Sequence, residues 1–300
     1  MPDLPTTTGT LDFRGWSTWY QVTGEVSGAR TPLVTLHGGP GASHDYILSL
    51  TDLAAGDRAV VHYDQLGCGR STHLPDRGGD FWTVELFLDE LDNLLGRLGL
   101  AEGYHLLGQS WGGMLAAEHA VRRPAGLRSL VISNSPASMA LWSEAADGLR
   151  ALLPDGVREA LERHEADGTY DDPEYLAATE AYYGRHVCRV RPYPPEVQHS
   201  FDQIGQDPTV YHTMNGPNEF HCLGTLRDWS IVERAGLIDV PTLLVSGRHD
   251  EATPLVVQPF FDAIPDVRWE VFEESSHMPF VEERSRYMEV VGAFLAAHDR

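Results

Sequence analysis

The most constraining feature of the sequence is a serine flanked by glycines, between an apolar run and a helix-compatible stretch. The serine is Ser110 in the pattern Gly108-x-Ser110-x-Gly112, and the run before it is typical of a buried strand. A side chain at either glycine would collide with neighbouring backbone in so tight a turn. The pattern predicts a sharp strand–turn–helix that lifts the serine hydroxyl clear of a sheet. The N–H groups at the helix N-terminus would then point at that hydroxyl.

Predicted strands and helices alternate on both sides of that turn. We expect a hairpin over 10–22, strands at 33–36, 59–63 and 130–133, helices over 84–100 and after the serine, strands at 242–246 and 268–272, and a closing helix over 287–298. Alternation of this kind predicts the α/β class, with a mainly parallel sheet covered by helices on both faces.

The alternation stops between about residues 136 and 236. This stretch is helical in pattern, punctuated by proline, and without strand signals. We interpret it as a helical cap inserted into the α/β core. The predicted organisation is therefore a core in two parts, 1–135 and 237–300, with a cap over 136–236.

Charge and composition exclude several classes of partner. The formal net charge is −22 and all 22 basic residues are arginine, so the chain is not expected to bind nucleic acid or an anionic membrane surface. No apolar run is long enough to span a membrane, and the first residues lack the basic and apolar regions of a secretory signal. We therefore expect a cytoplasmic protein.

The cysteines and histidines predict neither a disulfide framework nor a metal site. Cys68, Cys188 and Cys222 are an odd number, widely spaced and without a C-x-x-C pair, which favours reduced thiols. The spacing of His212, His221 and Cys222 fits no common zinc pattern. No cofactor is expected.

Two later loops carry the residues that a serine nucleophile needs. A serine hydroxyl becomes reactive when a base removes its proton, and a carboxylate must orient that base. Asp250 follows the predicted strand at 242–246, and His277 follows the predicted strand at 268–272. This chain order of serine, acid and histidine is that of the α/β-hydrolase fold. We therefore predict an α/β-hydrolase fold with an inserted helical cap, and a catalytic triad of Ser110, Asp250 and His277.

The oxyanion hole of such a triad needs two backbone N–H donors. One is expected from Trp111, the residue after the nucleophile. The other is expected from Gly39, in the turn His37-Gly38-Gly39-Pro40-Gly41 that follows the strand at 33–36. Three glycines and a proline in five residues favour this turn over a helix, and a glycine lets substrate approach the backbone closely.

Three segments together resemble the proline iminopeptidase (prolyl aminopeptidase) family. They are His37-Gly38-Gly39-Pro40-Gly41, Asp64-Gln65-x-Gly67-Cys68-Gly69-Arg70-Ser71 and Gly108-Gln109-Ser110-Trp111-Gly112-Gly113. The likeness runs from about residue 10 to the end of the chain. The segment Met214-Asn215-Gly216-Pro217-Asn218-Glu219-Phe220 resembles the tricorn-associated aminopeptidase branch and related amino-acid amidases. The resemblance implies an α/β-hydrolase with a helical cap, as the strand pattern predicts independently.

The resemblance also implies how substrate is bound. In that family acidic residues bind the free α-ammonium group, and by resemblance Glu219 and Glu251 are those residues here. Two carboxylates in a half-closed pocket would offer an ammonium group charge-assisted hydrogen bonds that are stronger than in water. Trp111, Tyr211 and Phe220 either wall an apolar pocket for a proline ring or another small side chain, or pack in the core.

The predicted function is hydrolysis of the amide bond after a free N-terminal amino acid, proline or another small apolar residue. The substrate is a short peptide with a free α-amino group, and an aminoacyl-enzyme forms on Ser110. The alternatives are an amino-acid amidase with the same triad and glutamates, an esterase or lactonase of the same fold, and a non-catalytic ligand receptor. The preferred N-terminal residue, the peptide length and the oligomeric state stay open.

Overall fold

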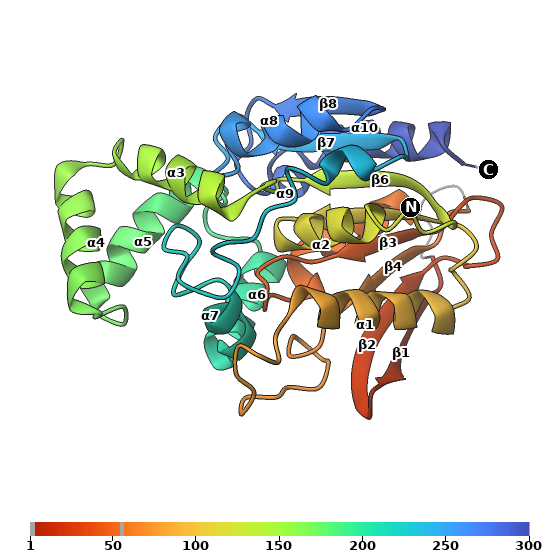
Figure 1. The fold of residues 1–300 in the computed structure, drawn as a ribbon, viewed down its shortest axis with the longest axis horizontal. Coiled ribbons are helices and arrows are strands. Elements are labelled where there is room, and N and C mark those ends of the chain that lie inside the picture. Colours follow the sequence, from red (N-terminus) through yellow and green to blue (C-terminus); the bar gives the residue numbers. More distant parts are fainter. Residues whose placement is uncertain (1–3, 55–56, 300) are drawn as a thin grey trace.

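In the computed structural model, which describes residues 4–54 and 57–299, eight strands form one sheet in the order β1-β2-β4-β3-β5-β6-β7-β8 (Figure 1). The strands are β1 Thr6–Phe13, β2 Trp16–Thr23, β3 Leu33–Leu36, β4 Val60–Tyr63, β5 Tyr104–Gln109, β6 Leu127–Ser133, β7 Thr242–Gly247 and β8 Val267–Phe272. β1 and β2 pair antiparallel, β2 pairs antiparallel with β4, and every later pair in the order is parallel. The prediction of an α/β-hydrolase fold with a mainly parallel sheet is confirmed.

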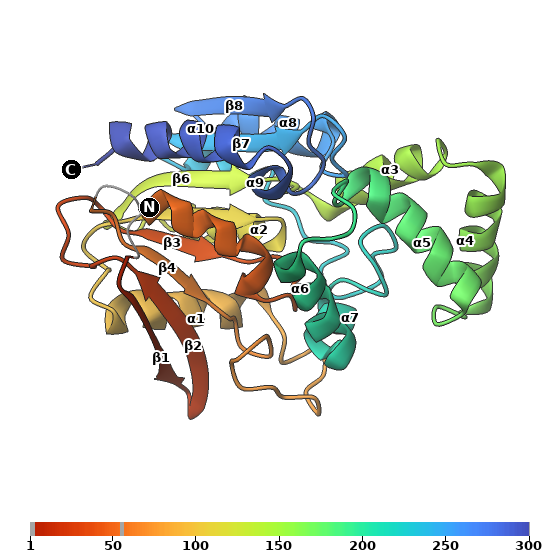
Figure 2. The same cartoon turned by 180° about the vertical axis from the view of Figure 1, so that it is seen from behind.

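Helices cover both faces of the sheet, as the views from opposite sides show (Figures 1 and 2). The core helices are η1 His44–Ala54 (a 3₁₀ helix), α1 Val84–Arg97, α2 Trp111–Ala120, η2 Ala235–Leu237, α8 Pro254–Ala263, α9 Pro279–Glu282 and α10 Arg284–Ala297. α1, α2 and α8 pack on one face, while η1, α9 and α10 pack on the other. No element is predicted from the sequence over 44–54, although Ile47, Leu50 and Leu53 recur there every third residue and are buried in η1.

The central strands are buried on both faces, so consecutive side chains enter opposite apolar layers. In β6, Leu130 and Ile132 belong to the layer under α2, whereas Val131 belongs to the layer under α10. All three side chains are at most 1% exposed. Strands buried in this way are continuous apolar runs rather than alternating ones, which is why they are recognisable in the sequence.

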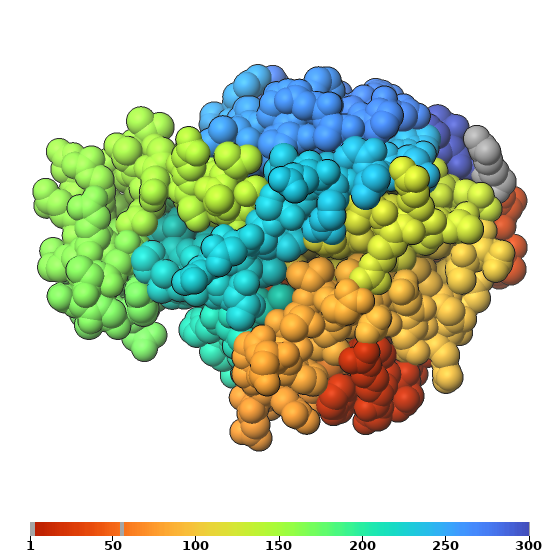
Figure 3. Space-filling model, in the orientation of Figure 1, coloured from red at the N-terminus to blue at the C-terminus, as the bar shows by residue number. Residues whose placement is uncertain are grey.

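Helices α3 to α7 lie between β6 and β7, in the interval predicted to form the cap, and α3, α4 and α5 project beyond one end of the core (Figures 1 and 3). They are α3 Met139–Arg150, α4 Asp155–Asp167, α5 Pro173–His186, α6 Pro195–Gln206 and α7 Thr209–Met214. α3, α4 and α5 enclose an apolar cluster of their own, and α6 packs against η1 of the core. No helix in the described residues is long and apolar enough to cross a membrane.

Candidate active site

Ser110 occupies the turn between β5 and α2, with backbone φ of 56° and ψ of −125°. The two flanking glycines are sterically required there. A Cβ on Gly108 would lie 2.0 Å from the carbonyl oxygen of Gly112, and a Cβ on Gly112 would lie 2.1 Å from that of Leu36. The turn therefore has the predicted shape, and it leaves Ser110 9% exposed at the floor of a cavity.

Asp250 and His277 come together at the ends of the neighbouring strands β7 and β8. His277 Nδ1 lies 2.7 Å from Asp250 Oδ1, the distance of a charge-assisted hydrogen bond. The backbone N–H of Ala252 also donates to Asp250 Oδ1 at 2.8 Å, and Asn134 Nδ2 donates to Oδ2 at 2.5 Å. These bonds fix the carboxylate, and the carboxylate in turn orients the imidazole with Nδ1 toward Asp250.

The electrostatics of His277 suit a general base. Burial by itself lowers the pKa of the imidazole, but the Asp250 carboxylate and the more distant charge of Glu219 outweigh burial and raise the pKa above its ordinary value. Ser110 and His277 line the same cavity. No hydrogen bond joins the Ser110 hydroxyl to His277 in the described residues, and such bonds commonly tighten only when substrate binds.

The two predicted oxyanion-hole residues lie on either side of Ser110. Gly39 adopts φ of +107°, and a Cβ there would lie 2.6 Å from the backbone nitrogen of Gly41, so only glycine fits the turn. Trp111 is the first residue of α2, where backbone N–H groups have no partner within the helix. Among the described residues, neither the Gly39 nor the Trp111 N–H donates to an acceptor. Both residues line a cavity with Ser110.

Gln65, after β4, links the glycine turn to the indole of Trp111, and sequence reasoning missed this role. Gln65 donates from its backbone to His37 Nε2 at 3.0 Å and from its side chain to the His37 carbonyl at 2.9 Å. Trp111 Nε1 donates to Gln65 Oε1 at 2.8 Å. The glycine turn and the start of α2 are thus tied together through one buried side chain.

A second link joins the glycine turn to the histidine loop. Tyr46 accepts a hydrogen bond from the Gly38 N–H at 2.7 Å and donates to Gln109, the residue before the nucleophile. Gln109 Nε2 then donates to the His277 carbonyl at 3.1 Å. The adjacency of Gln109 to Ser110 was the only sequence signal for this network.

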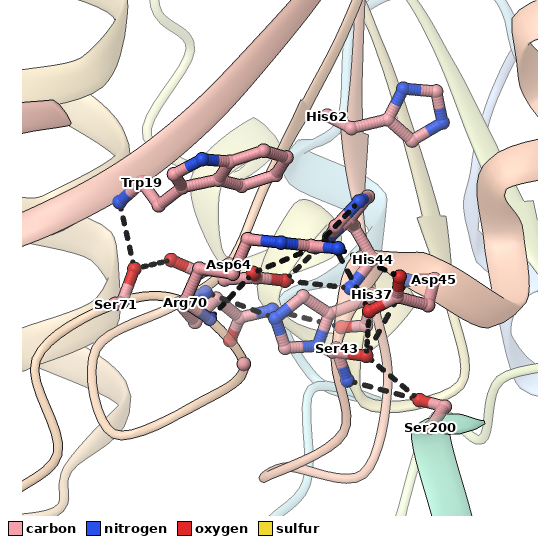
Figure 4. A network of polar contacts seen from close by, with 12 residues as sticks. Trp19, His37, Ser43, His44, Asp45, His62, Asp64, Arg70, Ser71 and Ser200 are labelled. Atoms are coloured by element: carbon pink, nitrogen blue, oxygen red, sulfur yellow. Dashed lines mark hydrogen bonds and ion pairs between the residues drawn. The ribbon is translucent and has the colours of Figure 1, made fainter. Parts of the chain in front are cut away.

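Beneath the glycine turn lies a buried polar network that reaches the cap (Figure 4). Asp64, at the end of β4, accepts from the backbone N–H and from Nδ1 of His44, each at 2.8 Å. Burial alone would raise the pKa of Asp64, but these bonds and the charge of His44 lower it below its ordinary value. The neighbouring Ser43 lies 3.1 Å, oxygen to oxygen, from Ser200 on α6. The network therefore fixes the turn and docks α6 against it.

Glu219 is held at the cavity by aromatic side chains of the cap. Its Oε1 accepts from the Tyr211 hydroxyl at 2.7 Å, and its carbonyl accepts from Trp142 Nε1 at the same distance. Its N–H donates to the Tyr183 hydroxyl at 3.3 Å. Burial raises the pKa of the carboxyl, although the Tyr211 bond opposes the shift. Glu219 lines both cavities that contain Ser110.

Glu251, the residue after Asp250, is 1% exposed. Neither of its carboxylate oxygens has a hydrogen-bond partner of normal geometry in the described residues, although the Tyr182 hydroxyl is near enough to oppose the rise in the pKa of the carboxyl, and Oε1 lies 3.9 Å from His277 Nε2. Burial, then the charges of Glu219 and Asp250, raise the pKa of this carboxyl well above its ordinary value. A buried acid without a partner is costly, so the arrangement favours a cationic group that would supply the missing bonds.

The aromatic residues and the cysteine that the sequence singled out have separate surroundings. Tyr211 binds Glu219, and Trp111 lines a cavity beside Ser110, whereas Phe220 packs in the cap with its ring 4.5 Å from that of Tyr182. The thiol of Cys68 is buried, which raises its pKa well above the ordinary value and leaves it unreactive.

One group of ligand-type side chains lies in the cap, away from the cavity, among the residues that the structure describes. It consists of His164, Asp172 and Glu174. Glu174 pairs with Arg163 at 2.5 Å, and His164 bonds Thr169 at 2.6 Å, so these side chains already have partners. His212, His221 and Cys222 do not form such a group in the described part of the chain.

Comparisons with known proteins show which family the chain is similar to. A family model described as the alpha/beta hydrolase fold matches residues 31–284. The proline iminopeptidase of Lactobacillus delbrueckii subsp. lactis is 39% identical over 291 residues, covering 96% of this chain and 98% of that protein.

Two solved structures superpose along nearly the whole chain. The proline iminopeptidase of Mycobacterium smegmatis is 53% identical with a TM-score of 0.91, covering 97% of this chain and 98% of that one. VinJ is 56% identical with a TM-score of 0.96, covering 97% and 99%. The chain is therefore a hydrolase that belongs to the proline iminopeptidase family of α/β-hydrolases.

Proposed function

We propose that this hydrolase removes proline from the N-terminus of short peptides, with Ser110 as nucleophile. The observation that carries the proposal is that Ser110, His277 and Glu219 line one cavity. His277 is hydrogen-bonded to Asp250 on one side, and the buried carboxylate of Glu251 lies 3.9 Å from its Nε2. The names of the relatives support proline as the released residue.

In the proposed mechanism, His277 takes the proton of Ser110 as the hydroxyl oxygen attacks the carbonyl carbon of the first residue. The oxyanion is held by the N–H groups of Gly39 and Trp111. His277 then gives the proton to the leaving amine, and the C–N bond breaks to leave a prolyl ester on Ser110. Water, deprotonated by the same imidazole, hydrolyses the ester and frees proline.

The two glutamates would bind the substrate's ammonium group. In the free site their pKa values are raised, chiefly by burial. An ammonium group would favour their ionised forms and supply donors to the unpartnered oxygens of Glu251. An N-acylated substrate has no such charge and leaves the carboxylates buried without compensation. The free N-terminus is thus selected by electrostatics.

The test is turnover of prolyl-4-nitroanilide against its N-acetyl form, with covalent labelling of the protein by a fluorophosphonate. We expect the free amine to be hydrolysed at least about 100-fold faster, and the label to be lost in Ser110→Ala. Equal turnover of the two anilides removes the role of the glutamates. Labelling that persists in Ser110→Ala removes the nucleophile.

We also propose a cytoplasmic location and a small-molecule substrate. Cys68, Cys188 and Cys222 are all free thiols, which supports the predicted reducing, cytoplasmic setting. The substrate is a small peptide or amino-acid amide.

A further inference from the structure

Two cavities meet at Ser110, and they share Gly39 and Glu219 as well as the serine. The larger lies toward α6. The smaller lies toward α2 and α3. A substrate bound across the serine therefore has its two halves in different surroundings.

His277 identifies which cavity receives the leaving group. The amine that departs must take a proton from the imidazole, so it lies on the side of Ser110 where His277 stands. His277 and Met278 line the larger cavity, whereas Trp111 and Trp142 line the smaller one. The N-terminal residue consequently occupies the smaller cavity, and everything after the scissile bond enters the larger.

The larger cavity is mostly apolar and, apart from His277, offers an anion no cationic side chain. Its apolar lining consists of Ala42, Val187, Val197, Phe201, Ile204 and Met278. None of the described residues that line it is an arginine, and its acidic member, Glu219, would repel a carboxylate. Phe201 and Ile204 also line a wider, more polar cavity, where the cation of Arg191 is already paired with Glu180 at 2.7 Å.

We propose that this leaving-group cavity selects an apolar, uncharged amine. Peptides or amides with a large apolar second residue and no neighbouring carboxylate are the favoured substrates, and free dipeptides are poor ones. The inference rests on the proposed function and adds the substrate class on the far side of the bond. It also favours peptide-like leaving groups over the ammonia released by an amino-acid amidase.

Three prolyl substrates with the same acyl group test the proposal: prolyl-leucinamide, prolyl-glycinamide and prolyl-leucine. The two amides release amines of similar basicity, so the difference between them reports binding of the side chain. We expect kcat/KM for the leucinamide to exceed that for the glycinamide by roughly 10- to 100-fold. We expect it to exceed that for prolyl-leucine by at least about 10-fold.

Substitutions in each cavity test which of the two binds the leucine side chain of the leaving group. Ile204→Ala should reduce the leucinamide preference over glycinamide by about 10-fold, because apolar contact is lost. Ile204→Arg should raise prolyl-leucine relative to prolyl-leucinamide, because it supplies a cation for the carboxylate. Leu226→Ala, in the smaller cavity, is the matched control and should change all three substrates by the same factor.

The outcomes separate this inference from the proposed function. Equal kcat/KM for the two amides, or a leucinamide preference that Leu226→Ala abolishes and Ile204→Ala leaves intact, overturns the cavity assignment. In that case prolyl-4-nitroanilide would still be cleaved and the proposed function would stand. No cleavage of any prolyl substrate, the anilide included, would instead overturn the proposed function.

Discussion

The core and the cap contribute to the site by different physical means. The core presents Ser110, Asp250 and His277 on short loops at the carboxyl ends of parallel strands. β5 and β7, which precede Ser110 and Asp250, are buried along their whole length, whereas β8, which precedes His277, is a partly exposed edge strand. The cap presents Glu219 on a turn held by hydrogen bonds from aromatic side chains. A position at the end of a buried strand is fixed by the sheet, whereas a position on the cap depends on a few side-chain contacts.

From this difference we expect the core to perform the chemistry and the cap to select the substrate. Bond breaking needs atoms held within a fraction of an ångström, which strand ends provide. Recognition of a charged N-terminus tolerates larger displacements of the side chain that binds it. Glu251 is the exception, because it is proposed to bind substrate but lies on a core loop, where its N–H donates to the carbonyl of His186 at the end of α5. Variants should therefore separate kcat effects from KM effects, except at this position.

The largest expected effect is at the core nucleophile. Ser110→Ala should lower kcat by about 10⁴- to 10⁶-fold on prolyl-4-nitroanilide, because no other described side chain replaces the attacking oxygen. Binding of proline as a competing product should persist, since Glu219 and Glu251 remain. Steady-state kinetics and calorimetric titration with proline measure both quantities. Retained turnover would show that chemistry is not centred on this loop.

The next largest effect is expected from the acid of the core. Asp250→Asn should lower kcat by about 10³- to 10⁴-fold with little change in KM, because the amide no longer stabilises the imidazolium. The comparison variant is Asn134→Ala, which removes one donor to the carboxylate and should cost much less. An Asp250→Asn loss confined to KM would contradict the division between core and cap.

The cap residue should act on substrate recognition. Glu219→Gln should lower kcat/KM for the free amine by about 100-fold, mainly through KM, because a desolvated charge pair is lost. The N-acetyl anilide should be nearly unaffected. Glu162→Gln, at an exposed glutamate of α4, controls for the general loss of negative charge in the cap. Equal losses on both substrates would mean that Glu219 does not recognise the amine.

The pH profile of activity tests a core residue of the triad and a recognition residue together, because His277 and Glu251 must both be deprotonated for activity. His277 must be neutral to act as base and its pKa is raised, so activity should fall as pH decreases through a value above 6.5. Glu251 must be ionised and its pKa is also raised, so it adds to the same acidic limb. Since Glu219 helps to raise the pKa of His277, Glu219→Gln should move the limb to lower pH.

The smallest expected effect is at the contact between core and cap. Ser200→Ala removes the hydroxyl that bonds Ser43 and should lower kcat/KM by about 3- to 10-fold, as expected for one modest hydrogen bond. His199→Ala, at an exposed neighbour on the same helix, should be close to neutral. Kinetics and thermal unfolding of both variants measure the difference.

The sequence predicted the sheet and its strand-end residues because both depend on local patterns. Buried apolar runs identify β3 and β7 within one residue, and the fold then implies where an acid and a histidine follow. The cap helices were expected only as a helical interval between 136 and 236. Their individual positions depend on packing that no short pattern records.

The supporting polar network could not be predicted, because its partners are far apart in the chain. Asn134 and Asp250 are 116 residues apart, and Tyr46 and Gln109 are 63 apart. Each residue alone looks like an ordinary polar or aromatic side chain. The unpartnered carboxylate of Glu251 is likewise a property of three-dimensional burial. The roles of the triad and glutamates remain predictions that the experiments above test.

The most direct measurement compares prolyl-4-nitroanilide with cyclopentanecarbonyl-4-nitroanilide, an analogue whose ring has the same shape and no amine. Both substrates are measured with the wild-type protein and with the double variant Glu219→Gln/Glu251→Gln. If the carboxylates select a positive charge while the core performs the hydrolysis, the wild type favours the prolyl substrate by at least about 100-fold. The double variant then brings the ratio close to one by slowing only the prolyl reaction. A ratio that the double variant leaves unchanged would contradict the account.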